Sequence, residues 1–117
     1  MVTGIHHVAI ISDSEKSVEF YRHLGFQECK RVRRESDMVV LLRGYDIELE
    51  IFVDPSHPAR ATKPEQRGLR HLALHVDSIE DTAKKLDICI GPIQLDWNGV
   101  RFAFASDPDG LPIELHE

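Results

Sequence analysis

The sequence lacks the features that mark several classes of protein. Its two cysteines, Cys29 and Cys89, form no close-spaced motif and are too few for a disulfide scaffold, so we expect buried or incidental thiols. No apolar stretch approaches the roughly 18 residues needed to span a bilayer, and there is no charged-then-apolar export signal. These absences argue against a membrane protein and lead us to expect a cytoplasmic one.

Positive charge is also scarce. The 14 Lys and Arg residues are outnumbered by 20 Asp and Glu residues, which gives a net charge of -6. Such a chain has no electrostatic footprint for nucleic acid, and the basic run at residues 30–34 is short enough to be an exposed strand. We therefore expect a small molecule, and neither a nucleic acid nor a membrane, as the binding partner.

An internal repeat is the most informative feature that is present. Residues 4–14 return at residues 68–78 with an offset of 64, and the identical pairs are Gly4/Gly68, His7/His71, Ala9/Ala73, Asp13/Asp77 and Ser14/Ser78. Unrelated segments of this length would share about one residue or fewer. The same offset relates Glu50 to Glu114, each of which stands between apolar residues. We therefore predict two tandem modules.

The first module reads as β-α-β-β-β. Asp13 and Ser14 are N-cap residue types that predict the start of a helix, and Gly25 predicts its C-cap. The apolar stripe of this helix is Val18, Tyr21 and Leu24. Gly44 predicts a turn between the last two strands. The expected strands are residues 5–11, 26–33, 38–43 and 47–53.

The second module repeats this order. Ser78 is the expected N-cap, and Ile79, Ala83 and Leu86 form the expected buried stripe of the second helix. Asp107-Pro108-Asp109-Gly110 predicts a turn between the last two strands. The expected strands are residues 69–76 and, more approximately, 90–95, 100–105 and 111–116.

A chain of 117 residues suits one domain, and two halves of about 55 residues would each be marginal alone, so a shared core is expected. We predict a single domain over residues 1–117. It comprises module one at about 4–53, a proline-rich linker at about 54–67 and module two at about 68–117. The fold class is α+β.

Strand alternation predicts where the repeated residues point, because side chains at i and i+2 share a face. His7 should lie on the face opposite Val8, and Glu50 on the face opposite Leu49 and Ile51. His71 and Glu114 should lie in the same way in module two. The helices should cover the apolar face, so the His and Glu residues should line an open, cleft-like face.

Two imidazoles and two carboxylates related by a repeat are suitable ligands for a divalent metal such as Ni, Zn, Co, Mn or Fe. The sequence therefore predicts His7, Glu50, His71 and Glu114 as metal ligands. His6 is the rival of His7, but it aligns with Arg70 and should point to the helix side. Glu48 is the rival of Glu50 and shares its face, so only the repeat offset disfavours it.

The chain resembles the vicinal oxygen chelate superfamily, and most of all its glyoxalase I-like (lactoylglutathione lyase-like) bacterial members. The resemblance covers essentially the whole chain, and its carriers are His6-His7-Val8-Ala9-Ile10, Val18-Glu19-Phe20-Tyr21, Leu24-Gly25-Phe26, Ile47-Glu48-Leu49-Glu50, Gly68-Leu69-Arg70-His71-Leu72-Ala73 and residues 107–115. It implies paired βαβββ modules forming an open barrel-like cleft around a metal. It also implies the same four ligands that the repeat selects.

The resemblance further implies a chemistry. Members chelate two neighbouring substrate oxygens and stabilise an enediolate or enolate, which is Lewis-acid catalysis. A glyoxalase-like lyase or isomerase would use Glu114, with Glu50 as a second candidate, to move a proton next to a carbonyl. The alternatives are an epimerase, a thiol transferase, a dioxygenase or a small-molecule-binding module without catalysis.

The substrate is expected to be a small oxygen-rich compound or a thioester. Glutathione-using glyoxalases of the family carry an Arg four residues after the first His ligand, where this chain has Ile11. The loop residues Arg60 and Lys63 are further candidates for binding a carboxylate or phosphate. The other substrate candidates are Glu48, His75, Arg67, Arg70 and His116. Since twofold pairing is the commonest assembly and sheet edges need covering, we expect a homodimer. Relatives build the site within one chain or from two.

Overall fold

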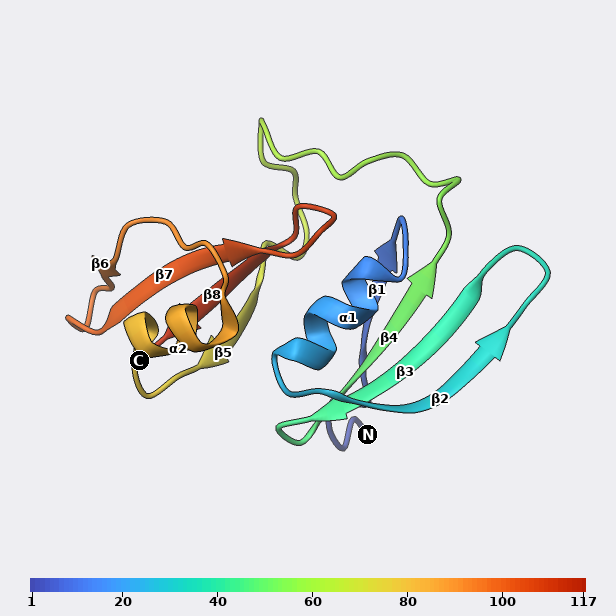
Figure 1. Ribbon diagram of the computed structural model, residues 1–117, viewed down its shortest axis with the longest axis horizontal. Helices are drawn as coiled ribbons and strands as arrows, with labels where there is room; N and C mark the ends of the chain where they lie inside the picture. Colours follow the sequence, from blue (N-terminus) through green and yellow to red (C-terminus); the bar gives the residue numbers. More distant parts are fainter. The chain divides into compact units, whose positions relative to one another are not determined.

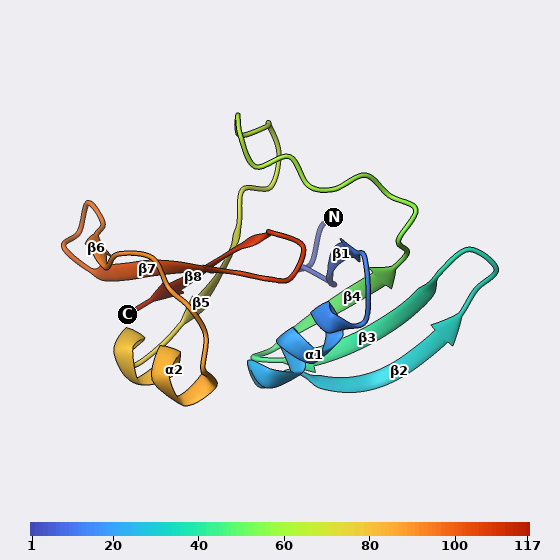
Figure 2. The ribbon, with the colours of Figure 1, turned by 45° about the horizontal axis from the view of Figure 1, so that its top comes forward.

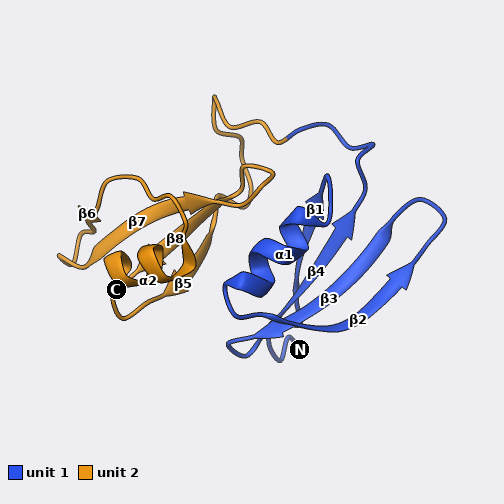
Figure 3. Cartoon of the chain, viewed as in Figure 1, with its two compact units in different colours: residues 1–59 blue, residues 60–117 orange.

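The computed structural model describes residues 1–117, which form two compact units, residues 1–59 and 60–117 (Figure 3). Each unit has one helix and one four-stranded sheet that does not close into a barrel. The order β-α-β-β-β predicted for both modules is confirmed, and so is the α+β class. That the two units share one core remains a prediction.

The first unit contains one mixed sheet with the order β1-β4-β3-β2 (Figure 1). The outer strand β1 runs parallel to β4, whereas β4, β3 and β2 pair antiparallel. The elements are β1 (Val8–Ser12), α1 (Lys16–His23), β2 (Gln27–Arg33), β3 (Met38–Gly44) and β4 (Ile47–Val53).

One face of this sheet is covered by α1, as both ribbon views show (Figures 1 and 2). Val18 and Tyr21 of α1 are fully buried, as are Leu49 and Ile51 of β4. On β1, Ile10 is buried while its neighbours Ala9 and Ile11 are exposed. The predicted alternation is therefore confirmed in the burial of β1 and β4, with the apolar residues toward the helix.

The first strand and the start of the first helix differ from the prediction. The strand begins at Val8 instead of Ile5, so His6 and His7 precede it. The N-cap is Glu15, without a side-chain cap bond, so the prediction of Asp13 or Ser14 was wrong. Ser14 instead forms a turn before the helix, because its carbonyl accepts from the Ser12 hydroxyl at 2.8 Å and from the Ser17 N–H at 3.3 Å.

The end of α1 depends on Gly25. The N–H of Phe26 donates to the carbonyl of Tyr21, and the N–H of Gly25 donates to the carbonyl of Arg22. This pair of hydrogen bonds is the pattern that ends a helix through a residue in the left-handed conformation. Gly25 has a φ of +111°. The Tyr45 hydroxyl packs against it and donates to the Leu24 carbonyl at 2.6 Å. The predicted glycine is confirmed, one position beyond the C-cap Leu24.

The hairpin between β3 and β4 explains why Tyr45 can reach Gly25. Gly44 pairs with Ile47, so the loop consists of Tyr45 and Asp46, whose φ values are +54° and +61°. Positive φ at both central residues is the mark of a type I′ turn, which matches the twist of the strands. The turn predicted at Gly44 is therefore centred one residue later.

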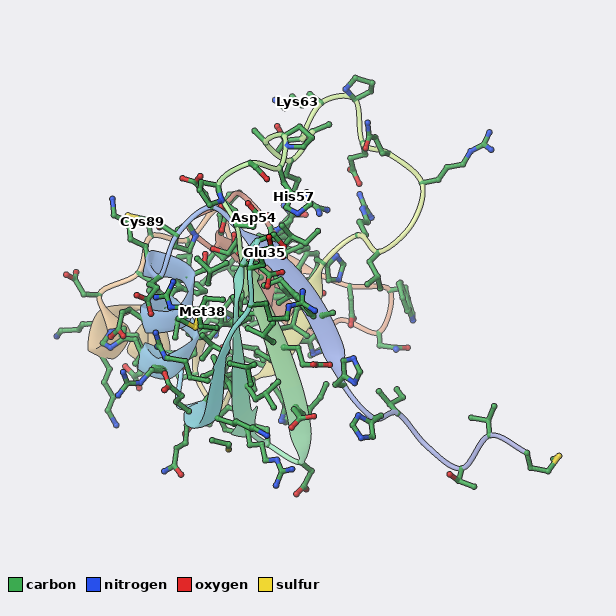
Figure 4. All side chains as sticks on the ribbon, turned by 90° about the vertical axis from the view of Figure 1, so that its right-hand side faces the viewer. Glu35, Met38, Asp54, His57, Lys63 and Cys89 are labelled. Carbon is green, nitrogen blue, oxygen red and sulfur yellow. The ribbon has the colours of Figure 1, made fainter.

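Strand β2 is the charged edge of the first sheet. All of its residues are exposed, as predicted for the basic run. The register shifts between Glu28 and Lys30, which leaves Cys29 as a bulge. Charge and bulging both protect a sheet edge from pairing with other chains. Cys29 and Cys89 are both exposed, so the alternative of buried thiols was wrong; Cys89 is labelled in Figure 4.

The second unit repeats this topology with the order β5-β8-β7-β6, and β5 runs parallel to β8. Two of its strands are clearly shorter than predicted, since β5 starts three residues late and β6 keeps only two residues. The elements are β5 (Leu72–His75), α2 (Ile79–Leu86), β6 (Gln94–Leu95), β7 (Arg101–Ser106) and β8 (Pro112–His116).

The second helix is capped as the sequence predicts. The Ser78 hydroxyl accepts from the Asp81 N–H at 3.2 Å. Ile79 is fully buried and packs in a core cluster with Ala103 and Leu115. Of the predicted stripe, Ala83 and Leu86 are only half-buried. Both helices of the chain have eight residues, so neither is long enough to cross a membrane.

Two loops of the second unit are held by aspartates. The Asp107 carboxylate accepts from the backbone N–H groups of Asp109 and Leu111, both at 2.9 Å, which confirms the predicted turn.

No helix or strand lies between Val53 and Leu72, which confirms the absence of regular structure in the predicted linker. Lys63 is exposed on this loop (Figure 4).

Asp96 fixes the turn between β6 and β7. One carboxylate oxygen accepts from the N–H groups of Asn98 at 2.8 Å and Val100 at 2.9 Å, and the other lies 3.0 Å from His116 Nε2. The Val100 N–H, with help from His116, lowers the pKa of Asp96. The bond to Asp96 raises the pKa of His116.

We expect Gly25→Ala to destabilise the protein by about 2 kcal/mol, because a left-handed backbone disfavours a Cβ and the new methyl would overlap the Tyr45 hydroxyl. The loss should be smaller in a Tyr45→Ala background, where only the backbone cost remains. A double-mutant cycle by chemical denaturation measures this coupling. Strictly additive losses would contradict the contact.

The Asp96–His116 pair predicts a pH-dependent stability. Asp96 has a pKa below its ordinary 3.8, so its contribution is present above that pH and is lost as pH falls through the lowered pKa. His116 has a pKa above its ordinary 6.5, so its contribution is present below that pH and is lost as pH rises through the raised pKa. The difference in Tm between wild type and Asp96→Asn should therefore be largest between these two values. A difference that does not vary from pH 3 to pH 9 would contradict the pair.

Candidate metal centre

His7 and Glu50 form a pair in the first unit. Parallel pairing of β1 with β4 places Ala9 opposite Glu50, and His7 lies two residues before Ala9. His7 Nε2 makes an ion-pair contact with Glu50 Oε2. The carboxylate stands on the open face because its neighbours Leu49 and Ile51 are buried under the helix.

His71 and Glu114 form the same pair in the second unit. Parallel pairing of β5 with β8 places Ala73 opposite Glu114, and His71 Nε2 lies 2.8 Å from Glu114 Oε2. Phe104 is the β7 partner of Glu114. Its ring meets the His71 imidazole edge-on, with 5.1 Å between ring centroids.

The two His–Glu pairs occupy equivalent positions in the two units. The offset of 64 that relates the sequences also relates the registers, because it carries the Ala9–Glu50 pair onto the Ala73–Glu114 pair. Each unit therefore brings an imidazole nitrogen and a carboxylate oxygen together by itself. Neither strand pairing depends on the other half of the chain.

The charges of these pairs suit a dication. Glu50 and Glu114 make ion pairs with histidine alone, and no Lys or Arg neutralises either carboxylate. With neutral imidazoles each pair carries one negative charge, so two pairs would balance a divalent ion. Imidazole nitrogen and carboxylate oxygen are ligands that Zn, Mn, Fe, Co and Ni accept. The residues present therefore fit the metal that the sequence predicts.

The two rival residues also lie beside His7. His6 Nδ1 is 2.8 Å from His7 Nδ1 and 3.8 Å from Glu48 Oε2. Donor atoms of His6, His7 and Glu48 all lie within 4.8 Å of one another, which makes them a second group able to approach a cation. Glu48, however, also contacts Arg43, with Arg43 Nε 3.4 Å from Glu48 Oε1. Sequence reasoning treated His6 as the alternative to His7, and Glu48 as the alternative to Glu50. It did not predict that His6, His7 and Glu48 lie close together.

A shallow depression of about 500 Å³ opens next to this group. Its walls come from the end of β3, the hairpin turn and the start of β4, together with His6. The residues that line it are His6, Arg43, Gly44, Tyr45, Asp46, Ile47 and Glu48.

The remaining substrate candidates lie in different environments. His75 is exposed on β5, and Arg67 is exposed in the linker. Arg70 pairs with Glu65 through two bonds of 2.7 and 2.9 Å, and this guanidinium lowers the pKa of Glu65. Arg60 donates to backbone carbonyls at 3.4 Å, so Arg60 and Arg70 both have local structural partners.

His116 has partners on both ring nitrogens. Nδ1 lies 2.9 Å from the Glu117 carbonyl and Nε2 lies 3.0 Å from Asp96. Both partners are oxygen acceptors, so His116 serves the second unit as a donor. Sequence reasoning missed Asp96, although an Asp followed by Asn and Gly is a typical turn signal.

Comparisons with known proteins identify the relatives of this chain. The uncharacterised protein YwkD of Bacillus subtilis (strain 168) is 46% identical over 128 residues, covering 100% of this chain and 98% of YwkD. A glyoxalase family protein from Enterococcus faecalis has a crystal structure with a TM-score of 0.88 and 40% identity, covering 97% of each chain.

Two more distant structures share the fold. Lactoylglutathione lyase from Agrobacterium tumefaciens has a TM-score of 0.70 and 21% identity, covering 99% of this chain and 94% of the lyase. A variant of the fosfomycin resistance protein FosX from Listeria monocytogenes, complexed with Mn(II) and 1S,2S-dihydroxypropylphosphonic acid, has a TM-score of 0.74 and 17% identity, covering 99% of this chain and 93% of FosX.

The family itself is shown by a match over nearly the whole chain. The family model that matches residues 4–115 spans both βαβββ units, including both His–Glu pairs. The resemblance stated from the sequence is thereby confirmed. The chain belongs to the Glyoxalase/Bleomycin resistance protein/Dioxygenase superfamily.

Proposed function

We propose that His7, Glu50, His71 and Glu114 are the ligands of one divalent metal ion, and that the protein is a glyoxalase-like lyase or isomerase that moves a proton next to a carbonyl. The observation that carries this proposal is the pair of equivalent His–Glu contacts, one in each unit. A repeat that preserves the same two residue types at the same register favours a shared role. The Mn(II) in the FosX complex is consistent with such a role in this superfamily.

A bound divalent ion would supply Lewis-acid polarisation of substrate oxygens. The chain itself must supply ligands and a group that accepts and returns the proton. In the glyoxalase-like reaction that the family resemblance implies, a ligand carboxylate leaves the metal, takes a proton from carbon and gives it back. The two candidates are therefore Glu50 and Glu114.

We assign the proton transfer first to Glu114. Its side chain is 14% exposed, compared with 22% for Glu50. Its β7 neighbour is aromatic, and Phe104 stacks edge-to-face with Phe102 at 5.9 Å between ring centroids. Glu50 faces the aliphatic Leu41. The aromatic surface beside Glu114 limits the access of water to that carboxylate.

The substrate we propose is a small oxygen-rich carbonyl compound or a thioester. Ile11 is 53% exposed on the open face of β1, where glutathione-using relatives are expected to carry an arginine. An apolar side chain there offers no partner for a glutathione carboxylate. A hemithioacetal of a smaller thiol, or a small hydroxy ketone, suits this face better.

We also propose that the protein is a cytoplasmic homodimer. The outer strands β1 and β5 leave hydrogen-bonding edges that carry neither the charges nor the bulge of β2. Sheet edges of this kind are usually covered, and closed twofold pairing is the commonest assembly of soluble oligomers.

The metal proposal predicts that removing either pair reduces binding. Protein purified without chelator or affinity metal should contain about one metal ion per chain, because the two His–Glu pairs are proposed to hold one ion together. His7→Ala and His71→Ala should each weaken affinity by at least about 100-fold, since loss of a ligand exceeds the loss of an outer partner. His75→Ala, an exposed histidine on β5, is the matched control and should bind as wild type. Elemental analysis and chelator competition measure these values, and wild-type protein that takes up no Ni, Zn, Co, Mn or Fe would contradict the site.

The proton-transfer assignment predicts a separate effect. Glu114→Gln should lower kcat by about 100-fold or more with an active hemithioacetal or hydroxy ketone, because an amide cannot accept the proton. The metal content of the variant must be measured in the same samples. Unchanged turnover with metal retained would remove Glu114 from the role and turn attention to Glu50→Gln.

A further inference from the structure

The His7 ring has partners on opposite sides. Nε2 contacts Glu50, while Nδ1 lies 2.8 Å from Nδ1 of His6. We propose that His6 is a positioning residue, which holds His7 in the ring orientation and tautomer that a metal requires. This inference rests on the proposed role of His7 as a ligand.

The chemistry of a neutral imidazole explains the need for such a partner. A ring that offers the Nε2 lone pair to a metal carries its hydrogen on Nδ1, and that N–H needs an acceptor. His6 Nδ1 is at hydrogen-bond distance to accept it. When His7 Nε2 instead carries the hydrogen and donates to Glu50, His7 Nδ1 becomes an acceptor.

An imidazole is suited to both situations. His6 can accept from His7 Nδ1–H as one tautomer and donate to His7 Nδ1 as the other. An ionised carboxylate could only accept, and a guanidinium could only donate. His6 therefore lets His7 exchange its tautomer on metal binding without losing this hydrogen bond.

The charges argue against His6 and Glu48 as ligands of an ion of their own. Glu48 already contacts the Arg43 guanidinium, so a dication beside Glu48 would face a positive charge. Glu50 has no such ion pair with a Lys or Arg, and its ion-pair partner is His7. Glu48 lies 3.8 Å from His6, which is too long for a hydrogen bond. The cation should therefore prefer the Nε2 side of His7.

The second unit lacks this arrangement. The offset of 64 places Arg70 where the first unit has His6, and Pro112 where it has Glu48. Arg70 cannot accept a hydrogen bond, and it pairs with Glu65. The positioning role of His6 is therefore specific to the first half of the chain, and Arg70 provides a matched control.

We would titrate metal-free full-length wild type, His6→Ala, His6→Asn and Arg70→Ala with Ni²⁺ and with Mn²⁺ against a chromophoric chelator. His6→Ala should weaken affinity by about 10-fold, the lower end for an outer partner, because His6 is 86% exposed and water competes. His6→Asn places an amide group near the position of Nδ1 and should recover most of the loss. Arg70→Ala should bind as wild type.

The outcomes separate this inference from the function on which it rests. Wild type that binds neither metal contradicts the metal site itself. Wild type that binds while His6→Ala binds equally well contradicts the role of His6 alone. A fall from two ions per chain to one in His6→Ala would show that His6 is a ligand, which also overturns the inference. The metal-free wild type and variants should have the same Tm in thermal denaturation. A lower Tm for His6→Ala would instead indicate a general loss of structure, which asparagine would not restore.

Discussion

Parallel pairing of the first strand of each unit with the last is the constraint on which the site depends. It sets Ala9 opposite Glu50 in one sheet and Ala73 opposite Glu114 in the other. The histidine that precedes each first strand then reaches the carboxylate without a long loop. A shift of one residue in either register would turn the glutamate toward the helix, since alternate strand residues face opposite sides.

The helices enforce that register. Leu49 and Ile51 on β4, and Ile113 and Leu115 on β8, are fully buried on the covered faces. Exposing such residues would cost about 1.5–3 kcal/mol each. The carboxylates are therefore held on the open faces by the burial of their neighbours, and the Gly25–Tyr45 contact joins the end of α1 to the hairpin that carries β4.

The sequence predicted the parts of the structure that leave a periodic or repeated trace. The 64-residue offset predicted two βαβββ units, and alternation predicted the faces of β1, β4 and β8. Ser78 was identified as a cap because it is an N-cap residue type with an acidic residue, Asp81, three residues later. Ser14 was wrongly predicted as a possible cap. Its carbonyl accepts from the Ser12 hydroxyl in a turn before the helix, and such a turn leaves no periodic trace in the sequence.

Contacts between residues distant in sequence were not predictable from pattern. The turn at Tyr45 and Asp46 uses positive φ in residues other than glycine. The contact of Asp96 with His116 depends on the pairing of β7 with β8, which sets His116 opposite Phe102 near the β6–β7 turn. Sequence reasoning treated His6 and His7 as alternatives, because alternation assigned them to opposite faces. The strand begins only at Val8, so alternation governs neither His6 nor His7, and the two rings meet.

The central claim is that the two His–Glu pairs serve one metal ion. Crystals of the metal-loaded protein, measured by anomalous diffraction at the absorption edge of the bound metal, test it most directly. We expect one anomalous peak per site, bonded to His7, Glu50, His71 and Glu114 from one chain or from two copies of it. Separate peaks at the two pairs, or a peak bonded to His6 and Glu48, would contradict the account.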